Sequence, residues 1–132
     1  MGAAEKPVHL QRGELGEAAA KRHLQGKGLK FLCGNYKSQY GEIDLIFRED
    51  SALVFVEVKT RSSEEWTRPA SAVNAGKRRR LARTARDYIQ RLKDPEVRYR
   101  FDVVEVLLEE GAVGEIRHLP NAFSSARRIW RG

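Results

Sequence analysis

Two apolar segments separated by a short polar turn constrain this chain most strongly. They are GEIDLIFR, residues 41–48, and ALVFVEVKT, residues 52–60, with residues 49–51 between them. Both segments have the β-branched and aromatic content of strands, and the turn is short enough for a hairpin. The pair therefore predicts two adjacent antiparallel strands.

The charged residues of this hairpin share faces within each strand. Side chains alternate between the two faces of a strand. Glu42 and Asp44 therefore lie on one face of the first strand, together with Ile46. Glu57 and Lys59 likewise share a face of the second strand. The opposite faces are expected to carry only apolar side chains, namely Ile43, Leu45, Phe47, Val54, Val56 and Val58.

One register brings the like faces together. If Glu49 pairs with Ala52, Asp44 lies directly across from Glu57, and the apolar side chains meet on the other face. A slip by one residue would set Asp44 against Val56 and mix carboxylates into the packed face, which is unfavourable. The sequence therefore predicts that Asp44 and Glu57 are cross-strand neighbours, within roughly 5 Å between Cβ atoms.

Two facing carboxylates repel each other when both are ionised, unless a cation lies between them. Mg²⁺ prefers oxygen ligands and commonly uses one or two carboxylates with water and substrate phosphate oxygens. Asp44, Glu57 and the backbone carbonyl of Val58 would suit Mg²⁺, and Mn²⁺ would substitute for it. Lys59, on the same face, would hold the attacking water or neutralise charge on the phosphorane. The set predicts phosphodiester hydrolysis.

An ordinary surface ion pair between Glu57 and Lys59 is the alternative interpretation. The strand that carries them is apolar on both faces up to Phe55. Such a strand is typical of the buried centre of a sheet, whose end opens into a cleft. Charged residues at that end favour the functional interpretation.

The rest of the chain predicts one mixed α/β domain over residues 1–132, with a flexible N-terminus over about residues 1–9. The order is αβββαββα, in which the first three strands form antiparallel hairpins and the fourth, returning after a helix, joins in parallel. The expected helices span 10–27, 73–93 and a short basic tail from Asn121, the further strands span 29–36, 97–108 and 113–119, and 61–69 is an irregular loop.

The net charge of +7, from 25 Lys and Arg against 18 Asp and Glu, suggests a polyanionic partner such as DNA. A basic protein without a nucleic-acid role is the alternative that charge alone leaves open. Trp66 would either stack on an exposed base or pack internally. The candidate phosphate contacts are Arg61, Lys77, Arg78, Arg79, Arg80, Arg83 and Arg86, with Arg127, Arg128 and Arg131 in the tail.

The composition also indicates a soluble, cytoplasmic protein. No apolar run approaches the roughly 20 residues needed to span a bilayer, and the N-terminal residues lack the apolar core of a secretory signal. Cys33 is the only cysteine, which excludes an internal disulfide. His9, His23 and His118 lack zinc-site spacing, and no chemistry is assigned to them.

The ordered motifs GELGEAAAKRHLQGKG, GEIDLI, VFVEVKTR and RFDVVEV resemble the YraN family of uncharacterised bacterial proteins. Asn35-Tyr36 and the helix entered at residues 77–81 also match, so the resemblance covers nearly the whole chain. The family is related to archaeal Holliday-junction resolvases. The resemblance implies a restriction-endonuclease-like fold, in which helices flank a central mixed β-sheet.

The resemblance also implies an active site of the PD-(D/E)XK type. Asp44, Glu57 and Lys59 match the signature Asp, Glu and Lys, although Ile43 stands where the name of the signature has proline. Glu17 matches the acidic residue that the resolvases place on their first helix. The alternative helix ligand is Glu14, three residues earlier and on a neighbouring part of the same helix surface.

The residues and the resemblance together predict a divalent-metal-dependent endonuclease that cleaves DNA, with branched or structured DNA as the expected substrate. Because related resolvases act as dimers, a homodimer is also expected. Two alternatives remain open, since a fold does not fix a reaction. One is a nucleic-acid-binding module without turnover, and the other is a subunit of a DNA repair or recombination complex.

Overall fold

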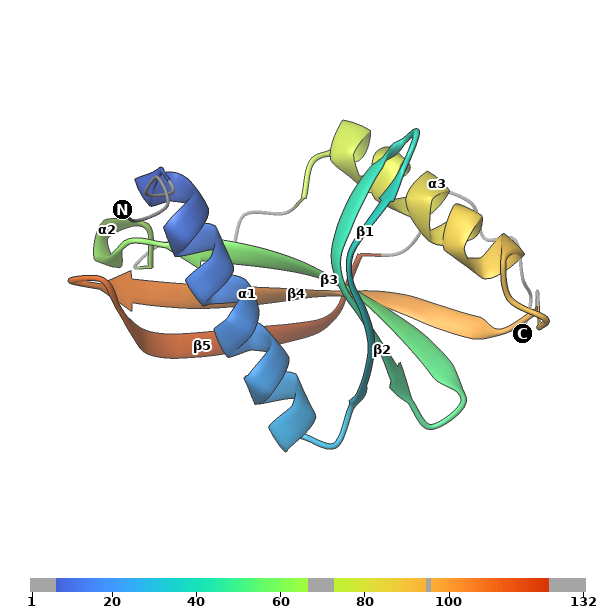
Figure 1. Ribbon diagram of the computed structural model, residues 1–132, viewed down its shortest axis with the longest axis horizontal. Coiled ribbons are helices and arrows are strands. Elements are labelled where there is room, and N and C mark those ends of the chain that lie inside the picture. The colour runs from blue at the N-terminus through green and yellow to red at the C-terminus, as the bar shows by residue number, and fades with distance from the viewer. Residues whose placement is uncertain (1–6, 67–72, 95, 124–132) are drawn as a thin grey trace, which may run out of the picture.

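The computed structural model describes residues 7–66, 73–94 and 96–123 (Figure 1). This part of the chain forms a five-stranded sheet with one long helix on each face. The elements are α1 (Val8–Gly26), β1 (Lys30–Ser38), β2 (Gly41–Glu49), β3 (Ala52–Arg61), α2 (Ser63–Trp66), α3 (Ala75–Gln90), β4 (Arg98–Glu109) and β5 (Ala112–Phe123).

The strands lie in chain order, β1-β2-β3-β4-β5. Neighbouring strands are antiparallel except β3 and β4, which are parallel and are connected through α2 and α3. A parallel pair needs such a crossover because the chain must return to the same end of the sheet. The antiparallel hairpins and the parallel fourth strand are confirmed, and the arrangement is the restriction-endonuclease-like α/β fold.

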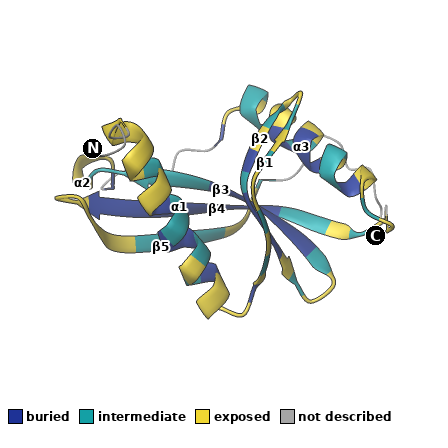
Figure 2. Cartoon of the chain, in the orientation of Figure 1, coloured by how far each residue is buried: buried dark blue, intermediate teal, exposed yellow. Residues whose placement is uncertain are grey.

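Each face of the sheet has its own apolar core, and β3 contributes to both. Val54 and Val56 pack with α1, whereas Leu53 and Phe55 pack with α3. Figure 2 shows the burial concentrated in the centre of the sheet, where β4 is buried without interruption from residue 101 to residue 108. The expected alternation of side chains between the two faces of β3 is confirmed, because Val54 and Val56 pack on the opposite face from Leu53 and Phe55.

α1 approaches the sheet closely because of a glycine. A Cβ atom on Gly16 would lie 2.2 Å from Oγ1 of Thr60 on β3, so a larger residue would force the two elements apart. The helix ends at Gly26 with Lys27 as its C-cap, and Gly28 continues the chain with a φ of +96°, a conformation that favours glycine. This close approach holds the residue after Gly16, Glu17, near the end of β3.

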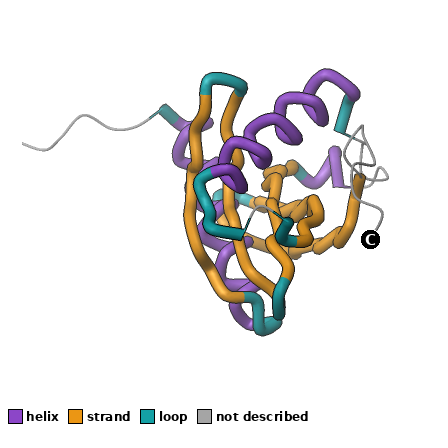
Figure 3. Tube along the Cα trace, turned by 90° about the vertical axis from the view of Figure 1, so that its right-hand side faces the viewer, coloured by secondary structure: helices purple, strands orange, loops and turns teal. Residues whose placement is uncertain are grey.

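The hairpin of β1 and β2 extends past the rest of the sheet. Pairing of β2 with β3 ends at Leu45 and Val56, whereas β1 and β2 stay paired up to the hairpin turn. The free part of the hairpin lies beside α3 (Figures 1 and 3), where Oγ of Ser38 donates to Oγ1 of Thr84 at 3.1 Å. β2 therefore separates from β3 at Asp44.

This separation corrects one expectation about the faces of β2. Ile43 packs in the α3 core, whereas Leu45 and Phe47 pack in the α1 core. The expectation that the three share a face is wrong. Strict alternation holds only while the strand stays in the plane of the sheet, and twist accumulates in the part of the hairpin that β3 no longer restrains.

Several element boundaries also differ from expectation. α1 begins at Val8, so residues 8 and 9 are helical rather than part of a flexible N-terminus. β5 extends to Phe123, which pairs with Phe101, so Asn121 lies in a strand instead of starting a helix. The remainder of the expected tail helix lies outside the described residues.

The loop expected over residues 61–69 contains the short helix α2. Ser62 and Glu65 cap it reciprocally, because the Ser62 N–H donates to Oε1 of Glu65 at 2.8 Å and the Glu65 N–H donates to Oγ of Ser62 at 3.4 Å. This capping box was readable as Ser-x-x-Glu but was missed. Among the described helices, none is both long and apolar enough to cross a membrane.

Candidate functional site

Asp44 and Glu57 face each other where β2 leaves β3. The two strands pair from Glu49 and Ala52 to Leu45 and Val56, which is the predicted register, and the next opposing positions are Asp44 and Glu57. Beyond this point the strands no longer pair through backbone hydrogen bonds. Instead, Oδ2 of the Asp44 side chain accepts the N–H of Val58 at 2.8 Å. The predicted pairing of strands is confirmed.

Both carboxylates line a cavity of about 240 Å³. Glu42 contributes to its β2 side, and the first turns of α3 close the other side with Lys77, Arg80 and Leu81. The cavity therefore has acids on the sheet and cations on the helix. A ligand with both positive and negative groups would match this lining.

Burial is the main cause that raises the pKa of Asp44, to about 8, and the negative charge of Glu57 is the second. The N–H of Val58 opposes both effects by stabilising the charged form. Asp44 therefore retains its proton at neutral pH, which relieves its repulsion with the charge of Glu57.

Glu57 is 8% exposed and is neutralised by a lysine from α3. Oε2 of Glu57 forms an ion pair with Nζ of Lys77, which also lines the cavity. The position of Lys77 is fixed at its backbone, because Oδ1 of Asn74, the N-cap of α3, accepts the Lys77 N–H at 2.8 Å. Sequence analysis placed Lys77 on a DNA-binding surface and did not anticipate this contact.

Lys59 lies two residues beyond Glu57 on the same face of β3 but is not part of the cavity lining. Partial burial lowers its pKa, and the neighbouring charges of Arg61 and Lys77 lower it further. A lysine that is partly desolvated among cations loses its proton more readily than one in water. Lys59 is thus a partly desolvated lysine near the acids, and the negative charge of Glu57 opposes the lowering of its pKa.

Glu17 is the helix acid that approaches the site. With its amide nitrogen toward the acids, Asn35 donates to Oε1 of Glu17 at 3.3 Å and to Oε2 of Glu42 at 3.0 Å. Burial raises the pKa of Glu17, and the charge of Glu42 raises it further. Glu14 is exposed and lies farther along the helix surface, so the geometry favours Glu17 of the two alternatives.

Asn35 has a positive φ of 52°, which asparagine tolerates better than most residues. Its link between Glu17 and Glu42 joins α1 to the β1–β2 hairpin. The sequence included Asn35 in a matching motif but assigned it no role. The sequence signal that could have identified it is an asparagine, a residue that readily adopts the left-handed backbone conformation, within a predicted strand.

Across the described ranges, no group of three or more His, Cys, Asp or Glu residues is placed to hold a metal ion. Two carboxylates with water and phosphate oxygens nevertheless suffice for Mg²⁺ in many proteins. Asp44 and Glu57 fit that mode, because their proximity already disfavours two negative charges without a cation.

Comparison with known sequences places the chain in a family. The sequence model of the uncharacterised protein family UPF0102 matches residues 16–106. The chain belongs to this family. It is also called the YraN family, so the resemblance of the motifs is confirmed.

Three relatives that bear the family name align with this chain over most of their own length. A UPF0102 protein of Symbiobacterium thermophilum is 46% identical over 84% of this chain and 94% of its own. One from Alkaliphilus metalliredigens is 41% identical over 84% and 96%. One from Geotalea daltonii is 40% identical over 86% and 90%.

In this UPF0102 protein the predicted nucleic-acid contacts separate into two groups. Arg79, Arg80 and Arg83 are exposed on α3, where they are accessible to phosphates. Arg78 instead donates from Nη1 to the carbonyl of Val73 at 2.7 Å and so stabilises the start of the helix. The tail arginines Arg127, Arg128 and Arg131 lie outside the described residues.

Trp66 and Arg61 are engaged with the protein itself. Trp66 is 9% exposed, and the guanidinium of Arg117 lies 3.7 Å from its ring centroid. Arg61 donates from Nε to Oε2 of the buried Glu105 at 3.2 Å. Of the two roles left open for Trp66, the structure shows packing, and base stacking would require it to leave this position.

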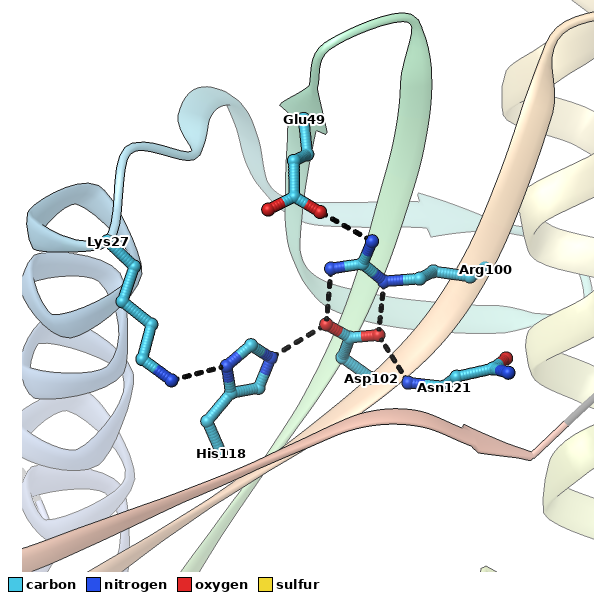
Figure 4. Close-up of polar contacts among 6 residues, drawn as sticks. All are labelled: Lys27, Glu49, Arg100, Asp102, His118 and Asn121. Carbon is cyan, nitrogen blue, oxygen red and sulfur yellow. Dashed lines mark hydrogen bonds and ion pairs between the residues drawn. The ribbon is translucent and has the colours of Figure 1, made fainter.

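Sequence analysis missed the most deeply buried of the carboxylates described, Asp102, which lies on the α1 face of the sheet (Figure 4). Asp102 is fully buried and accepts from Nε and Nη2 of Arg100 at 2.9 and 3.2 Å, and from the N–H of Asn121 at 2.9 Å. Nε2 of His118 lies 2.7 Å from the same carboxylate.

The Asp102 network joins four elements of this UPF0102 protein. Nη1 of Arg100 donates to Oε1 of Glu49 at the end of β2, at 2.6 Å. Nζ of Lys27, at the end of α1, lies 3.0 Å from Nδ1 of His118. A broad hollow of about 550 Å³ borders these residues. An aspartate within the apolar run FDVVEV was the signal that a buried partner exists.

Proposed function

We propose that this UPF0102 protein is a divalent-metal-dependent endonuclease that hydrolyses phosphodiester bonds in DNA. The observation that carries the proposal is the cavity where Asp44 and Glu57 meet beneath the basic start of α3. Two acids held together away from water are unfavourable unless a cation compensates them. This arrangement therefore suggests a site kept for a function rather than for stability.

The residues have distinct proposed roles. Asp44, Glu57 and the carbonyl of Val58 would hold Mg²⁺ or Mn²⁺, which supplies a Lewis acid for the phosphate and lowers the pKa of a bound water. Lys59 holds the attacking water or stabilises the charge that develops on the phosphorane. Glu17, connected through Asn35 to the β1–β2 hairpin, would be a further metal ligand, contributed by α1.

DNA is the proposed substrate, and branched or structured DNA is the proposed preference. The net charge of +7 and the exposed arginines of α3 beside the cavity support an extended phosphate-binding surface. Relatedness of the family to resolvases adds the preference for branched substrates. A homodimer and a cytoplasmic location complete the proposal.

A cleavage panel tests the proposal. Linear, flapped, single-stranded and four-way DNA, with matched RNA, would be incubated with Mg²⁺ or Mn²⁺ and either wild-type protein or Glu57→Ala. Gln90→Ala serves as the control, because Gln90 is an uncharged, exposed residue of α3 that does not line the cavity. We expect cleavage of at least one DNA by the wild type and by Gln90→Ala only. Wild-type protein that cuts no substrate would refute the nuclease proposal.

One observation favours a second candidate, a DNA-binding module without turnover. The ion pair of Lys77 with Glu57 neutralises one acid without a metal ion. A pure binding module should retain its DNA affinity in Glu57→Ala and should be indifferent to Mn²⁺. Metal-dependent cleavage of any DNA by the wild type excludes this candidate.

A further inference from the structure

Lys77 lies where a cation bound to Glu57 would lie. Its Nζ contacts Oε2 of Glu57 inside the cavity that Asp44 also lines. Glu57 is 8% exposed, so little of its surface remains for a second positive partner. An ammonium and a divalent ion would therefore compete for the same carboxylate oxygen.

The side chain of Lys77 can leave this position while its backbone stays in place. Asn74 caps the first turn of α3 at the Lys77 N–H, and Arg78 holds the preceding residue, Val73, by its carbonyl. The Lys77 side chain is 39% exposed, so it borders solvent as well as Glu57. A flexible four-carbon stem on a fixed helix start allows the ammonium to move without unfolding the helix.

We propose that Lys77 is a built-in counter-ion for Glu57, and that it moves off this carboxylate when a divalent cation binds. The inference rests on the proposed metal-dependent function and adds a regulatory step to the same site. Lys77 neutralises the charge of Glu57 within the cavity. A divalent cation must displace its ammonium to bind this carboxylate, so Lys77 lowers the affinity of the site for the metal. Once released, its ammonium lies on the same side of the cavity as Arg80, which also lines it.

Mn²⁺ affinity measures this competition directly. Binding of Mn²⁺ to the DNA-free protein would be followed by electron paramagnetic resonance for wild type, Lys77→Gln and Arg79→Gln. Arg79 is the matched control, because it is an exposed cation two residues away that does not line the cavity. We expect Lys77→Gln to bind Mn²⁺ about two- to five-fold more tightly, as expected for loss of a partly exposed ion pair.

The wild-type protein provides a second readout that does not depend on the folding of a variant. Acylation of lysines by an amine-reactive ester would be quantified by mass spectrometry with and without Mn²⁺. We expect Mn²⁺ to increase the acylation rate of Lys77 several-fold, because its amine leaves Glu57. Lys93, exposed near the end of α3, should not change.

The outcomes separate this inference from the proposed function. If neither wild type nor Lys77→Gln binds Mn²⁺, the metal-dependent function itself fails. If Mn²⁺ binds both with equal affinity, or more weakly to Lys77→Gln, only the counter-ion role is overturned. An equal gain in Arg79→Gln would also overturn it, because the effect would then come from net charge. Unchanged acylation of Lys77 on Mn²⁺ binding would have the same meaning.

Discussion

Asp44 and Asp102 belong to one sheet, yet the protein supports their carboxylates in opposite ways. Asp102 is contacted by a guanidinium, an imidazole and a backbone N–H. Asp44 accepts a single N–H, from Val58, and faces the acid Glu57. The first carboxylate is satisfied, whereas the second is left short of positive partners.

The two faces of the sheet therefore have different roles. On the α1 face, the Asp102 network connects four elements with one another, namely the end of α1, the end of β2, β4 and β5. On the α3 face, the acid pair opens into a cavity. Fully satisfied polar networks rigidify a fold, whereas acids with perturbed pKa values in a cavity mark candidate functional sites. Substitutions on the two faces should separate stability from activity.

The largest expected effect is on stability, at Asp102. Asp102→Ala should lower the free energy of unfolding by about 3–5 kcal/mol, because Arg100 loses its buried partner. Urea denaturation followed by circular dichroism would measure the loss. Asp44→Ala should cost much less, since it also relieves repulsion with Glu57. A greater loss of stability in Asp44→Ala than in Asp102→Ala would contradict the comparison.

The next effect is on activity, at Lys59. Lys59→Arg should reduce the rate of metal-dependent DNA cleavage by about 100-fold, because a planar guanidinium cannot replace a compact ammonium aimed at one water. Single-turnover cleavage of the best substrate measures this rate. The free energy of unfolding should change little. Near-normal cleavage by Lys59→Arg would remove the catalytic role from this residue.

The pH dependence of stability should distinguish the two faces next. In the folded protein the pKa of Asp44 is raised from 3.8 to about 8, so between these values only the folded state keeps the proton. The stabilising contribution is complete below about pH 4 and is lost as the pH rises through about 8. The slope for one proton is at most about 1.4 kcal/mol per pH unit.

Urea denaturation of wild type and Asp44→Asn from pH 5 to pH 8 isolates this contribution. The stability of the wild type should fall relative to Asp44→Asn as the pH rises, because asparagine cannot titrate. If the unfolding free energies of the two proteins change in parallel with pH, the pKa of Asp44 is not raised in the folded protein. Mn²⁺ should reduce the difference, since a cation favours the ionised form.

The smallest expected effect lies at the edge of the Asp102 network. Lys27 is exposed, so Lys27→Met should cost at most about 1 kcal/mol of unfolding free energy. Comparison of its denaturation midpoint with that of Asp102→Ala measures how strongly the network depends on its exposed end. A loss as large as that of Asp102→Ala would mean that the network is held together by Lys27.

Much of the fold was predictable because local patterns encode it. Alternation in residues 41–48 and 52–60 fixed the register of β2 and β3, since a slip by one residue would bury carboxylates. The helix between the third and fourth strands predicted their parallel pairing. The pattern did not predict the position of Ile43, because the twist of a hairpin that has left the sheet is not a local property.

The candidate site was predictable in its sheet residues and less so in its helix residues. Asp44 and Glu57 could be paired from strand periodicity alone. The preference for Glu17 over Glu14 required the packing of Gly16 on Thr60, which sets the position of α1. The contact of Lys77 with Glu57 required the placement of α3, because a cationic helix face has no fixed partner in sequence.

The sequence by itself determined the family, the order of the strands and the two acids that face each other. These depend on motifs and on periodicities of two or a few residues, which act within neighbouring segments. Only the tertiary structure decided that Lys77 neutralises Glu57, and that Asp102 joins Arg100 and His118. Such contacts connect segments whose separation depends on how helices and twisted strands pack, and no local pattern specifies that distance.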